Sequence, residues 1–284
     1  MSAQILDGKA LSLKIKEELA KKTAKLKEKG INPGLAVIIV GNDPASRVYV
    51  NNKKKACAEC GIYSEEYALS ENTTEKELTE LIEKLNSDSR INGILVQLPL
   101  PAGIDSEKIL LTIDHKKDVD AFHPVNVGKI MIGNFDFLPC TPAGVMELIH
   151  LTGIEVSGKE CVVVGRSNIV GKPQAMLLLH ENGTVTVCHS KTKNLTEVCR
   201  RADILVSAVG KAKFITADMV KPGAVVIDVG MNRENGKLVG DVDFDNVKEV
   251  ASAITPVPGG VGPMTIAMLM KNTVRAAEIS SLKE

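Results

Sequence analysis

The stretch Cys161-Val-Val-Val-Gly165-Arg-Ser-Asn-Ile-Val-Gly171-Lys-Pro173 joins a short apolar run to a loop that holds two glycines. The run at 161–164 predicts a buried strand, because valine favours the enclosed surface of a sheet. Gly165 permits a tight turn where the strand ends, and Gly171 lets a following helix approach closely. Free N–H groups at the start of that helix suit phosphate oxygens. The stretch therefore predicts a nucleotide-binding strand, loop and helix, and a plain turn is the alternative interpretation.

Similar apolar runs follow at regular spacing. Three further strands are predicted at 184–187, 204–208 and 225–228. The four strand starts lie 23, 20 and 21 residues apart, which leaves room for one helix and two loops between strands. This spacing is typical of a doubly wound parallel sheet. After these strands come a loop rich in proline and glycine at 255–263 and a predicted helix at 265–279.

The first part of the chain carries a second α/β series. We expect helices at 9–29, 46–60 and 74–86 and strands at 35–40, 62–69 and 93–98. A linker rich in Gly, Pro and Asn follows, and another helix begins near Pro142. We therefore predict an α/β protein of two three-layer lobes with a cleft between them. The predicted lobes are 1–120 and 121–264, and the last helix, 265–284, packs back on the first.

Composition excludes several classes of function. The chain has 284 residues with 35 Lys+Arg and 35 Asp+Glu, and a net charge of zero argues against a general nucleic-acid binder. No run approaches the roughly 20 apolar residues of a membrane span, and no signal peptide is evident. We therefore expect a cytoplasmic protein with no membrane or nucleic-acid partner. The six cysteines are scattered, which favours reduced thiols.

One cysteine pair has the spacing of a metal or redox motif. Cys57 and Cys60 form a single CxxC within a lysine-rich predicted helix, with no second pair and no histidine nearby. Such a pair indicates zinc or redox chemistry only weakly. We expect no metal site, and a CxxC redox or zinc module remains an alternative function.

The residues after the second strand of the nucleotide lobe favour NADP over NAD. Sheets that bind NAD usually place an acid there, on the ribose 2′-hydroxyl. This chain has Ser190 and Lys191 instead, and Arg166 lies in the glycine loop. A hydroxyl and two cations suit a 2′-phosphate, which a carboxylate would repel. A solvated loop is the alternative interpretation of Ser190 and Lys191.

Candidate catalytic residues lie in the first lobe. Tyr49 and Lys53 are four residues apart and share one helix face, where a partly dry cleft would lower the lysine pKa for acid–base work. Gln97 is a polar residue at the end of an apolar strand, where open α/β sheets place ligands. Asp118 and Asp120 follow in a loop. The alternatives are a solvated lysine face, a half-buried tyrosine, a structural amide and acids that cap a turn.

Five motifs occur together and in one order. They are Tyr49-Val-Asn-Asn-Lys53-Lys-Lys-Ala-Cys, Gly93-Ile-Leu-Val-Gln97-Leu-Pro-Leu-Pro101, Asp118-Val-Asp120-Ala-Phe-His-Pro124, Gly165-Arg-Ser-Asn-Ile-Val-Gly171 and Thr255-Pro-Val-Pro-Gly-Gly-Val-Gly-Pro263-Met-Thr265. Over nearly its whole length the chain resembles the family of bifunctional methylenetetrahydrofolate dehydrogenases and methenyltetrahydrofolate cyclohydrolases. A set of five motifs in register is far more specific than any single one.

The resemblance implies NADP-dependent oxidation of 5,10-methylenetetrahydrofolate to the methenyl form, followed by hydrolysis to 10-formyltetrahydrofolate. It also implies a Rossmann-like second lobe that forms a homodimer, and one-carbon supply to purine, histidine and methionine biosynthesis. By resemblance, Lys53 is the main cyclohydrolase residue, Gln97 interacts with it, and Tyr49 stacks on the folate. The substrate residues further include Asp120, Pro258, Gly259, Gly260, Gly262 and Pro263, and the cofactor residues are Gly165, Arg166, Ser167, Gly171, Ser190 and Met231.

The chain departs from the family pattern at two positions. The family more often has glycine where this chain has Ala121, and isoleucine where it has Met231. If the backbone at Ala121 has positive φ, the methyl group costs local strain. Two other functions remain open, namely a monofunctional dehydrogenase of the same fold and a non-catalytic nucleotide-binding regulator.

Overall fold

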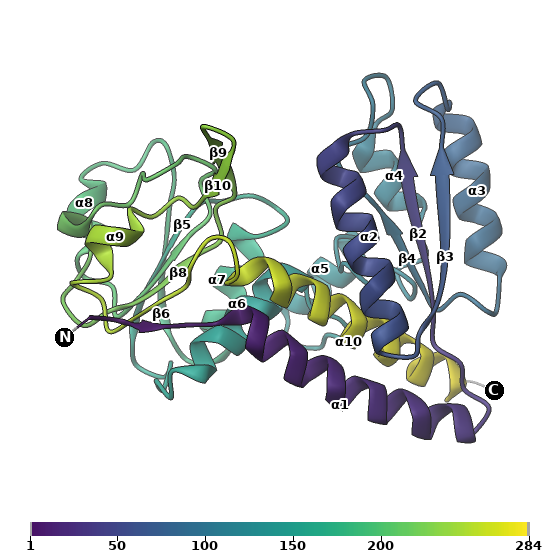
Figure 1. Ribbon diagram of the computed structural model, residues 1–284, viewed down its shortest axis with the longest axis horizontal. Coiled ribbons are helices and arrows are strands. Elements are labelled where there is room, and N and C mark those ends of the chain that lie inside the picture. Colours follow the sequence, from purple (N-terminus) through teal and green to yellow (C-terminus); the bar gives the residue numbers. More distant parts are fainter. Residues whose placement is uncertain (1, 283–284) are drawn as a thin grey trace. The chain divides into compact units, whose positions relative to one another are not determined.

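The computed structural model describes residues 2–282 as two compact α/β units (Figure 1). Unit 1 holds residues 2–12 and 141–265, and unit 2 holds residues 13–140 and 266–282. These ranges differ from the sequence-based boundaries, since residues 121–140 group with unit 2 and the first residues group with unit 1. Two of the boundaries fall inside the two longest helices, α1 (Gly8–Glu28) and α10 (Val261–Ser281), so each of these helices supplies residues to both units.

Unit 1 is built on a six-stranded sheet in which every pair of neighbours is parallel. In spatial order its strands are β1 (Gln4–Ile5), β11 (Ala253–Ile254), β8 (Val225–Asp228), β7 (Ile204–Ser207), β5 (Glu160–Val164) and β6 (Thr184–Cys188). The strands on the two sides of β5 are β6 and β7, so the chain reverses its direction of travel across the sheet there. This order confirms the predicted doubly wound sheet and places a ligand-binding switch point after β5 and β7.

Short helices and one hairpin complete unit 1. They are α6 (Cys140–Leu151), whose first residue belongs to unit 2, α7 (Gly171–His180), α8 (Leu195–Cys199), η1 (Ala217–Met219), α9 (Phe244–Val247) and the pair β9 (Asn232–Glu234) and β10 (Lys237–Val239). A buried core joins Val162 and Val164 of β5 to Leu205 of β7 and Val226 of β8. The loop predicted at 255–263 is shorter than expected, because α10 already begins at Val261. Pro263 lies in the first turn of α10. Backbone N–H groups in that turn have no hydrogen-bond partner within the helix, so the missing N–H of proline costs nothing there.

Unit 2 contains a three-stranded parallel sheet in the order β3 (Tyr63–Leu69), β2 (Gly34–Val40), β4 (Gly93–Val96). Every residue of β2 is buried, as its unbroken apolar run predicts for a central parallel strand. Helix α2 (Pro44–Glu59) contacts β2 and β3, whereas α3 (Glu75–Ser87) packs Leu78 and Ile82 into a core with Ile38 of β2. A capping box between Thr74 and Glu77 opens α3.

Unit 2 has two further helices that were not among the predicted elements. They are α4 (Ser106–Thr112) and α5 (Pro124–Met131). Asp105 caps α4 by accepting hydrogen bonds from the backbone of Glu107 and Lys108. In α5 the proline opens the first turn and His123 caps it, so this short helix forms inside a segment that reads as a linker. None of the helices within residues 2–282 is long and apolar enough to cross a membrane.

Candidate active site

Lys53 and Gln97 are brought into direct contact at one end of the sheet of unit 2. Helix α2 follows β2, and Gln97 is the first residue after β4, so both lie at the carboxyl ends of neighbouring parallel strands. Lys53 Nζ donates a 2.9 Å hydrogen bond to Gln97 Oε1, and Lys53 is only 9% exposed. Tyr49 lies one turn earlier on the same helix and is half-buried. The predicted contact between Lys53 and Gln97 is present.

The amide of Gln97 is fixed in one orientation. Its Nε2 donates to the carbonyl oxygen of Leu98 at 2.7 Å, so its Oε1 is the atom that faces Lys53. Its backbone N–H donates to the carbonyl oxygen of Ile38 at 2.9 Å, which ties the residue to β2. Gln97 is therefore a preset acceptor for the lysine ammonium.

Burial and charge act against each other on Lys53. Burial lowers the pKa of its ammonium, and the nearby Asp120 carboxylate raises that pKa. For Asp120 the signs are reversed, since burial raises the pKa of its carboxyl and the charge of Lys53 lowers it. A buried lysine with a lowered pKa next to a carboxylate is suited to proton transfer.

A buried turn holds the loop that carries Asp120. Asp118 Oδ2 accepts hydrogen bonds of 2.8 Å from the backbone N–H of His123 and from Asn126 Nδ2. Ala121 is fully buried with φ of +57°, and its N–H donates to the carbonyl oxygen of Asp118 at 3.1 Å. The backbone at Ala121 thus has the positive φ that glycine adopts most easily. The methyl group of Ala121 makes this conformation less favourable.

Cys140 is a site residue that the sequence did not indicate. It is the first residue of α6, it is buried, and its thiol donates to the carbonyl oxygen of Val119, the residue before Asp120, at 3.4 Å. Burial raises its pKa well above the usual range, so the sulfur keeps its proton. The sequence gives no signal for it, because a single cysteine in a Pro-rich segment carries no spacing information.

The CxxC pair does not have the character of a reactive site. Cys57 and Cys60 are both buried and unbridged, and burial raises the pKa of their thiols to about 12 and about 11. Neither sulfur is a thiolate at neutral pH. Within residues 2–282 no three His, Cys, Asp or Glu side chains are grouped so as to hold a metal ion.

The glycine loop of unit 1 has the geometry that its two glycines predict. Gly165 has φ of +133°, and a Cβ there would lie 2.4 Å from the carbonyl oxygen of Ala208, in the loop after β7. A Cβ on Gly171 would lie 2.2 Å from the carbonyl oxygen of Gly165. Ser167 Oγ accepts from the N–H groups of Val170 at 3.2 Å and Gly171 at 3.3 Å. The first turn of α7 therefore packs tightly against the loop, and only glycine fits at either position.

The residues predicted to select NADP leave adjacent strands at the same edge. Val164 of β5 pairs with Cys188 of β6, and the Gly165 N–H donates to the Cys188 carbonyl oxygen at 2.9 Å. Arg166 and Ser190 each stand two residues after this pair, and both are exposed. The end of β6 thus offers a hydroxyl and cations and has no acid, which fits the 2′-phosphate of NADP.

The remaining predicted residues also lie in unit 1. Met231 is 51% exposed, three residues past the end of β8. In the loop at 255–263, the Gly259 carbonyl oxygen accepts from the Lys9 N–H at 3.1 Å, and a Cβ on Gly8 would lie 1.9 Å from the Gly260 carbonyl oxygen. The predicted substrate residues are thus divided: the loop residues belong to unit 1, whereas Lys53 and Asp120 belong to unit 2.

Both parts of the chain match models of one protein family. Residues 6–120 match the catalytic domain of tetrahydrofolate dehydrogenase/cyclohydrolase, and residues 139–281 match the NAD(P)-binding domain of the same enzymes. The chain belongs to the tetrahydrofolate dehydrogenase/cyclohydrolase family. This assignment confirms the resemblance that the five motifs indicated.

Individual relatives match over almost the full length. A protein of Acetivibrio thermocellus named bifunctional protein FolD is 73% identical over 282 residues, which is 99% of each chain. The crystal structure of the bifunctional FolD enzyme from Campylobacter jejuni is 55% identical with a TM-score of 0.95, and the match covers 98% of this chain and 100% of that one. The Trypanosoma brucei methylenetetrahydrofolate dehydrogenase-cyclohydrolase, complexed with NADP cofactor and an inhibitor, is 42% identical with a TM-score of 0.95 over 99% of each chain.

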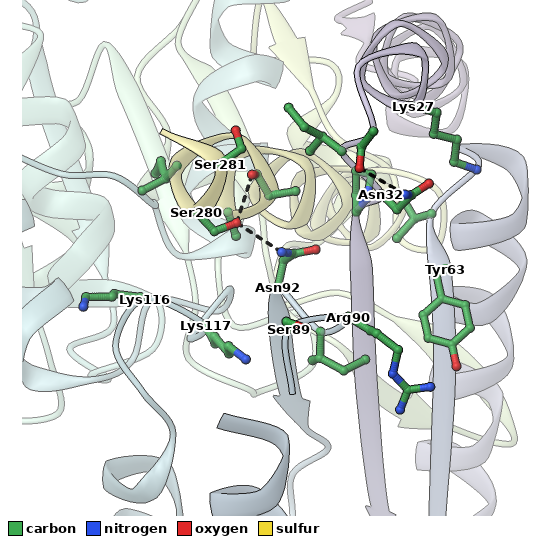
Figure 2. A pocket seen from close by; sticks show the side chains of 18 of the residues that line it. Lys27, Asn32, Tyr63, Ser89, Arg90, Asn92, Lys116, Lys117, Ser280 and Ser281 are labelled. Carbon is green, nitrogen blue, oxygen red and sulfur yellow. Dashed lines mark hydrogen bonds between the residues drawn. The ribbon is translucent and has the colours of Figure 1, made fainter. Parts of the chain in front are cut away.

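A pocket of about 980 Å³ lies at the amino ends of the strands of the unit 2 sheet, and Lys53 is not part of its lining. Figure 2 shows the side chains around it. Its lining includes Asn32 and Asn92, which precede β2 and β4, whereas Gln97 follows β4. Figure 2 shows Lys27 and Lys116 pointing to opposite sides of the pocket. Arg90 is paired with Asp88 at 2.7 Å. The cations therefore do not converge on one point, and in this family member the pocket is separate from the candidate catalytic residues.

Proposed function

We propose that this family member carries out two successive steps on a folate one-carbon unit. With NADP it oxidises 5,10-methylenetetrahydrofolate to 5,10-methenyltetrahydrofolate, and it then hydrolyses the methenyl form to 10-formyltetrahydrofolate. The observation that carries this proposal is the buried contact between Lys53 and Gln97 beside Asp120, in the same chain as an NADP-type glycine loop.

In the oxidation step, the residues of this chain bind and orient. The two glycines allow the loop to run closely into the start of α7, a helix N-terminus of the kind that receives phosphate oxygens, and Ser167 lies in the same loop. Arg166 and Ser190 fit the 2′-phosphate, and Met231 offers its backbone to the cofactor. When bound, NADP supplies the acceptor for the hydride of the folate methylene carbon at nicotinamide C4. Alignment of the two carbons is then the main contribution of the protein.

In the hydrolysis step, Lys53 supports the proton transfers. Water attacks the methenyl carbon and loses one proton, which gives a neutral hydroxyl adduct. The adduct's hydroxyl then loses the second proton as the ring C–N bond breaks, and the departing nitrogen takes up a proton, which leaves a formyl group and releases one proton overall. A lysine with a lowered pKa exchanges protons in both directions. Gln97 holds its Nζ in place, and Asp120 restores part of its basicity. We assign Tyr49 to stacking on the folate and Asp120 also to its ring. Pro258, Gly259, Gly260, Gly262 and Pro263 border the substrate in this proposal.

An absorbance assay with methylenetetrahydrofolate and NADP tests the proposal. The expected course is formation of NADPH together with methenyl product, followed by loss of the methenyl absorbance. A persistent methenyl product would instead support a monofunctional dehydrogenase. NADP binding without any turnover would support a non-catalytic regulator. The contact between Lys53 and Gln97 favours the bifunctional enzyme over both.

We also propose that the protein is a homodimer formed through its nucleotide-binding unit. Strand β6 is an edge strand of the six-stranded sheet, so within residues 2–282 its outer backbone groups have no neighbouring strand. Val187 on this strand is 38% exposed and Leu179 on α7 is 51% exposed, which supports an apolar contact there. Sedimentation of the wild type should give a dimer, and Val187→Glu should shift it toward the monomer. An unchanged dimer in this variant would contradict the assigned interface.

Cell location and pathway are proposed from the family. Bacterial relatives with the same two domains support a cytoplasmic enzyme of one-carbon metabolism that serves purine, histidine and methionine biosynthesis. The net charge of zero supports the proposal that nucleic acid is not a partner.

A further inference from the structure

Asp241 is a fully buried acid whose side chain contacts two loops of unit 1. It is 0% exposed and follows the hairpin strand β10. Its two carboxylate oxygens accept hydrogen bonds from five groups. The donors are the backbone N–H groups of Val209 (2.7 Å), Gly210 (3.1 Å) and Lys211 (2.9 Å), the Ser207 hydroxyl (3.4 Å) and Asn232 Nδ2 (2.9 Å).

The first of these loops follows β7. Three consecutive N–H groups, from Val209 to Lys211, converge on the one carboxylate. Converging backbone donors of this kind form a concave anion-binding site, and here an internal side chain fills it. Asp241 is buried although Gly210 and Lys211 are exposed, so loss of the carboxylate removes the shared acceptor that draws these three N–H groups together. The course of the loop after β7 therefore depends on Asp241.

The second loop follows β8 and carries Met231. Asn232 donates to Asp241 Oδ1, and a Cβ on Gly230 would lie 2.1 Å from the Asp241 carboxyl. The Asp241 backbone N–H in turn donates to Asp228 Oδ1 at 2.9 Å, and the same oxygen accepts from the Gly230 N–H at 2.9 Å. Met231 thus lies between two residues that are both fixed by buried carboxylates.

These two loops leave the carboxyl ends of β7 and β8, the edge at which doubly wound sheets bind nucleotides. The loop after β7 also touches the glycine loop, since a Cβ on Gly165 would lie 2.4 Å from the Ala208 carbonyl oxygen. A displacement at 209–211 is therefore transmitted to the glycine loop at Gly165 and, through Asp241, to the loop of Met231. Asp241 itself has no exposed surface with which to touch a ligand.

We propose that Asp241 is a positioning residue for the cofactor site, whose carboxylate locks the loop after β7 to the loop after β8 in the form that receives NADP. This inference rests on the proposed function, because it takes NADP to bind at this edge of the sheet. It adds to the proposed cofactor site a residue that does not touch NADP and acts by holding the loops that do. Neither its sequence neighbours nor the family motifs indicate that role.

Asp241→Asn tests the inference, and Asp245→Asn is its matched control. Asparagine presents an N–H₂ group to backbone donors, so it cannot replace the carboxylate. Asp245 lies in the same segment with a side chain that is 85% exposed. The measurements are the Kd of NADPH by its fluorescence and the hydrolysis of methenyltetrahydrofolate without nucleotide, which reports on the Lys53 site in the same preparation.

The expected result is a Kd for NADPH raised about tenfold in Asp241→Asn, with hydrolysis within about twofold of the control. Asn232→Ala removes one of the five donors and should raise the Kd in the same direction by less, which keeps the test open if Asp241→Asn does not fold. An unchanged Kd in the soluble variants, or an equal loss of binding and hydrolysis, would overturn the proposed positioning role. Wild-type protein that binds no NADPH would overturn the proposed function, and this inference with it.

Discussion

Lys53 Nζ and Gln97 Oε1 are joined by a 2.9 Å hydrogen bond, and the Gln97 amide is held in turn by the carbonyl oxygen of Leu98. The lysine is almost wholly buried, and its neighbour Asp120 supplies an opposing charge. Two distant segments of unit 2, helix α2 and the end of β4, thus build one buried hydrogen-bonded pair, to which we assign the proton transfers of hydrolysis.

Gln97→Ala should slow the hydrolysis of methenyltetrahydrofolate by about tenfold to a hundredfold, since one hydrogen bond to a charged group is worth about 1.5–3 kcal/mol. In this variant Lys53 can still exchange protons, but its Nζ is no longer held in position by the Gln97 amide. Steady-state hydrolysis rates measure the effect, and circular dichroism checks the fold. Wild-type rates in Gln97→Ala would show that the contact has no part in hydrolysis.

Removal of the Asp120 charge should shift the pH profile of hydrolysis toward lower pH. The Asp120 carboxylate raises the pKa of Lys53, so Asp120→Asn leaves burial as the main influence and the lysine loses its proton at lower pH. The profile of kcat against pH measures this shift. Asp136→Asn is the control, because Asp136 forms its ion pair with Lys129, at 2.6 Å. A shift to higher pH would contradict the assignment.

Ala121→Val should destabilise the protein by about 2 kcal/mol or more, because a β-branched residue is disfavoured at positive φ and the site is already full. Ala121 is completely buried with φ of +57°. Urea denaturation followed by circular dichroism gives the free energy of unfolding. Ala143→Val is a comparison at a buried position of helix α6. Equal stability of Ala121→Val and wild type would contradict the reported backbone conformation.

Ser190→Asp should reduce the preference for NADP. A carboxylate at the end of β6 repels the 2′-phosphate, so kcat/KM for NADP should fall by about tenfold or more while kcat/KM for NAD changes little. Ser157→Asp makes the same change at an exposed site before β5 and should leave the ratio unchanged. If Ser190→Asp kept the wild-type ratio of kcat/KM for NADP to kcat/KM for NAD, Ser190 would have no part in the choice of cofactor.

The central strands of both sheets were predictable because they are buried on two faces. Parallel strands such as β2, β5 and β8 appear in the sequence as continuous apolar runs. Such runs can be recognised without knowing which strands pair with them. The strands β1 and β11 have two residues each, too few for any pattern. Helix α5 was missed because its Pro, Gly and Asn residues are those of a loop, and capping by His123 forms it nonetheless.

The candidate site was predictable where residues fall in motifs and not where tertiary contacts alone define them. Lys53 and Gln97 stand out by spacing and by polarity within an apolar run. Cys140 joins them only through the fold. Asp241 meets the backbone donors of the loop after β7, which lie 30 to 32 positions earlier in the chain, and nothing in its local sequence marks it as buried.

Hydrolysis of methenyltetrahydrofolate by Lys53→Met tests the central claim most directly. Lys55→Met is the matched control, because Lys55 lies on the same helix with a side chain that is 77% exposed. With both variants folded, we predict that Lys53→Met loses hydrolysis by about a hundredfold or more and that Lys55→Met keeps it. Hydrolysis by folded Lys53→Met at the wild-type rate would contradict the account.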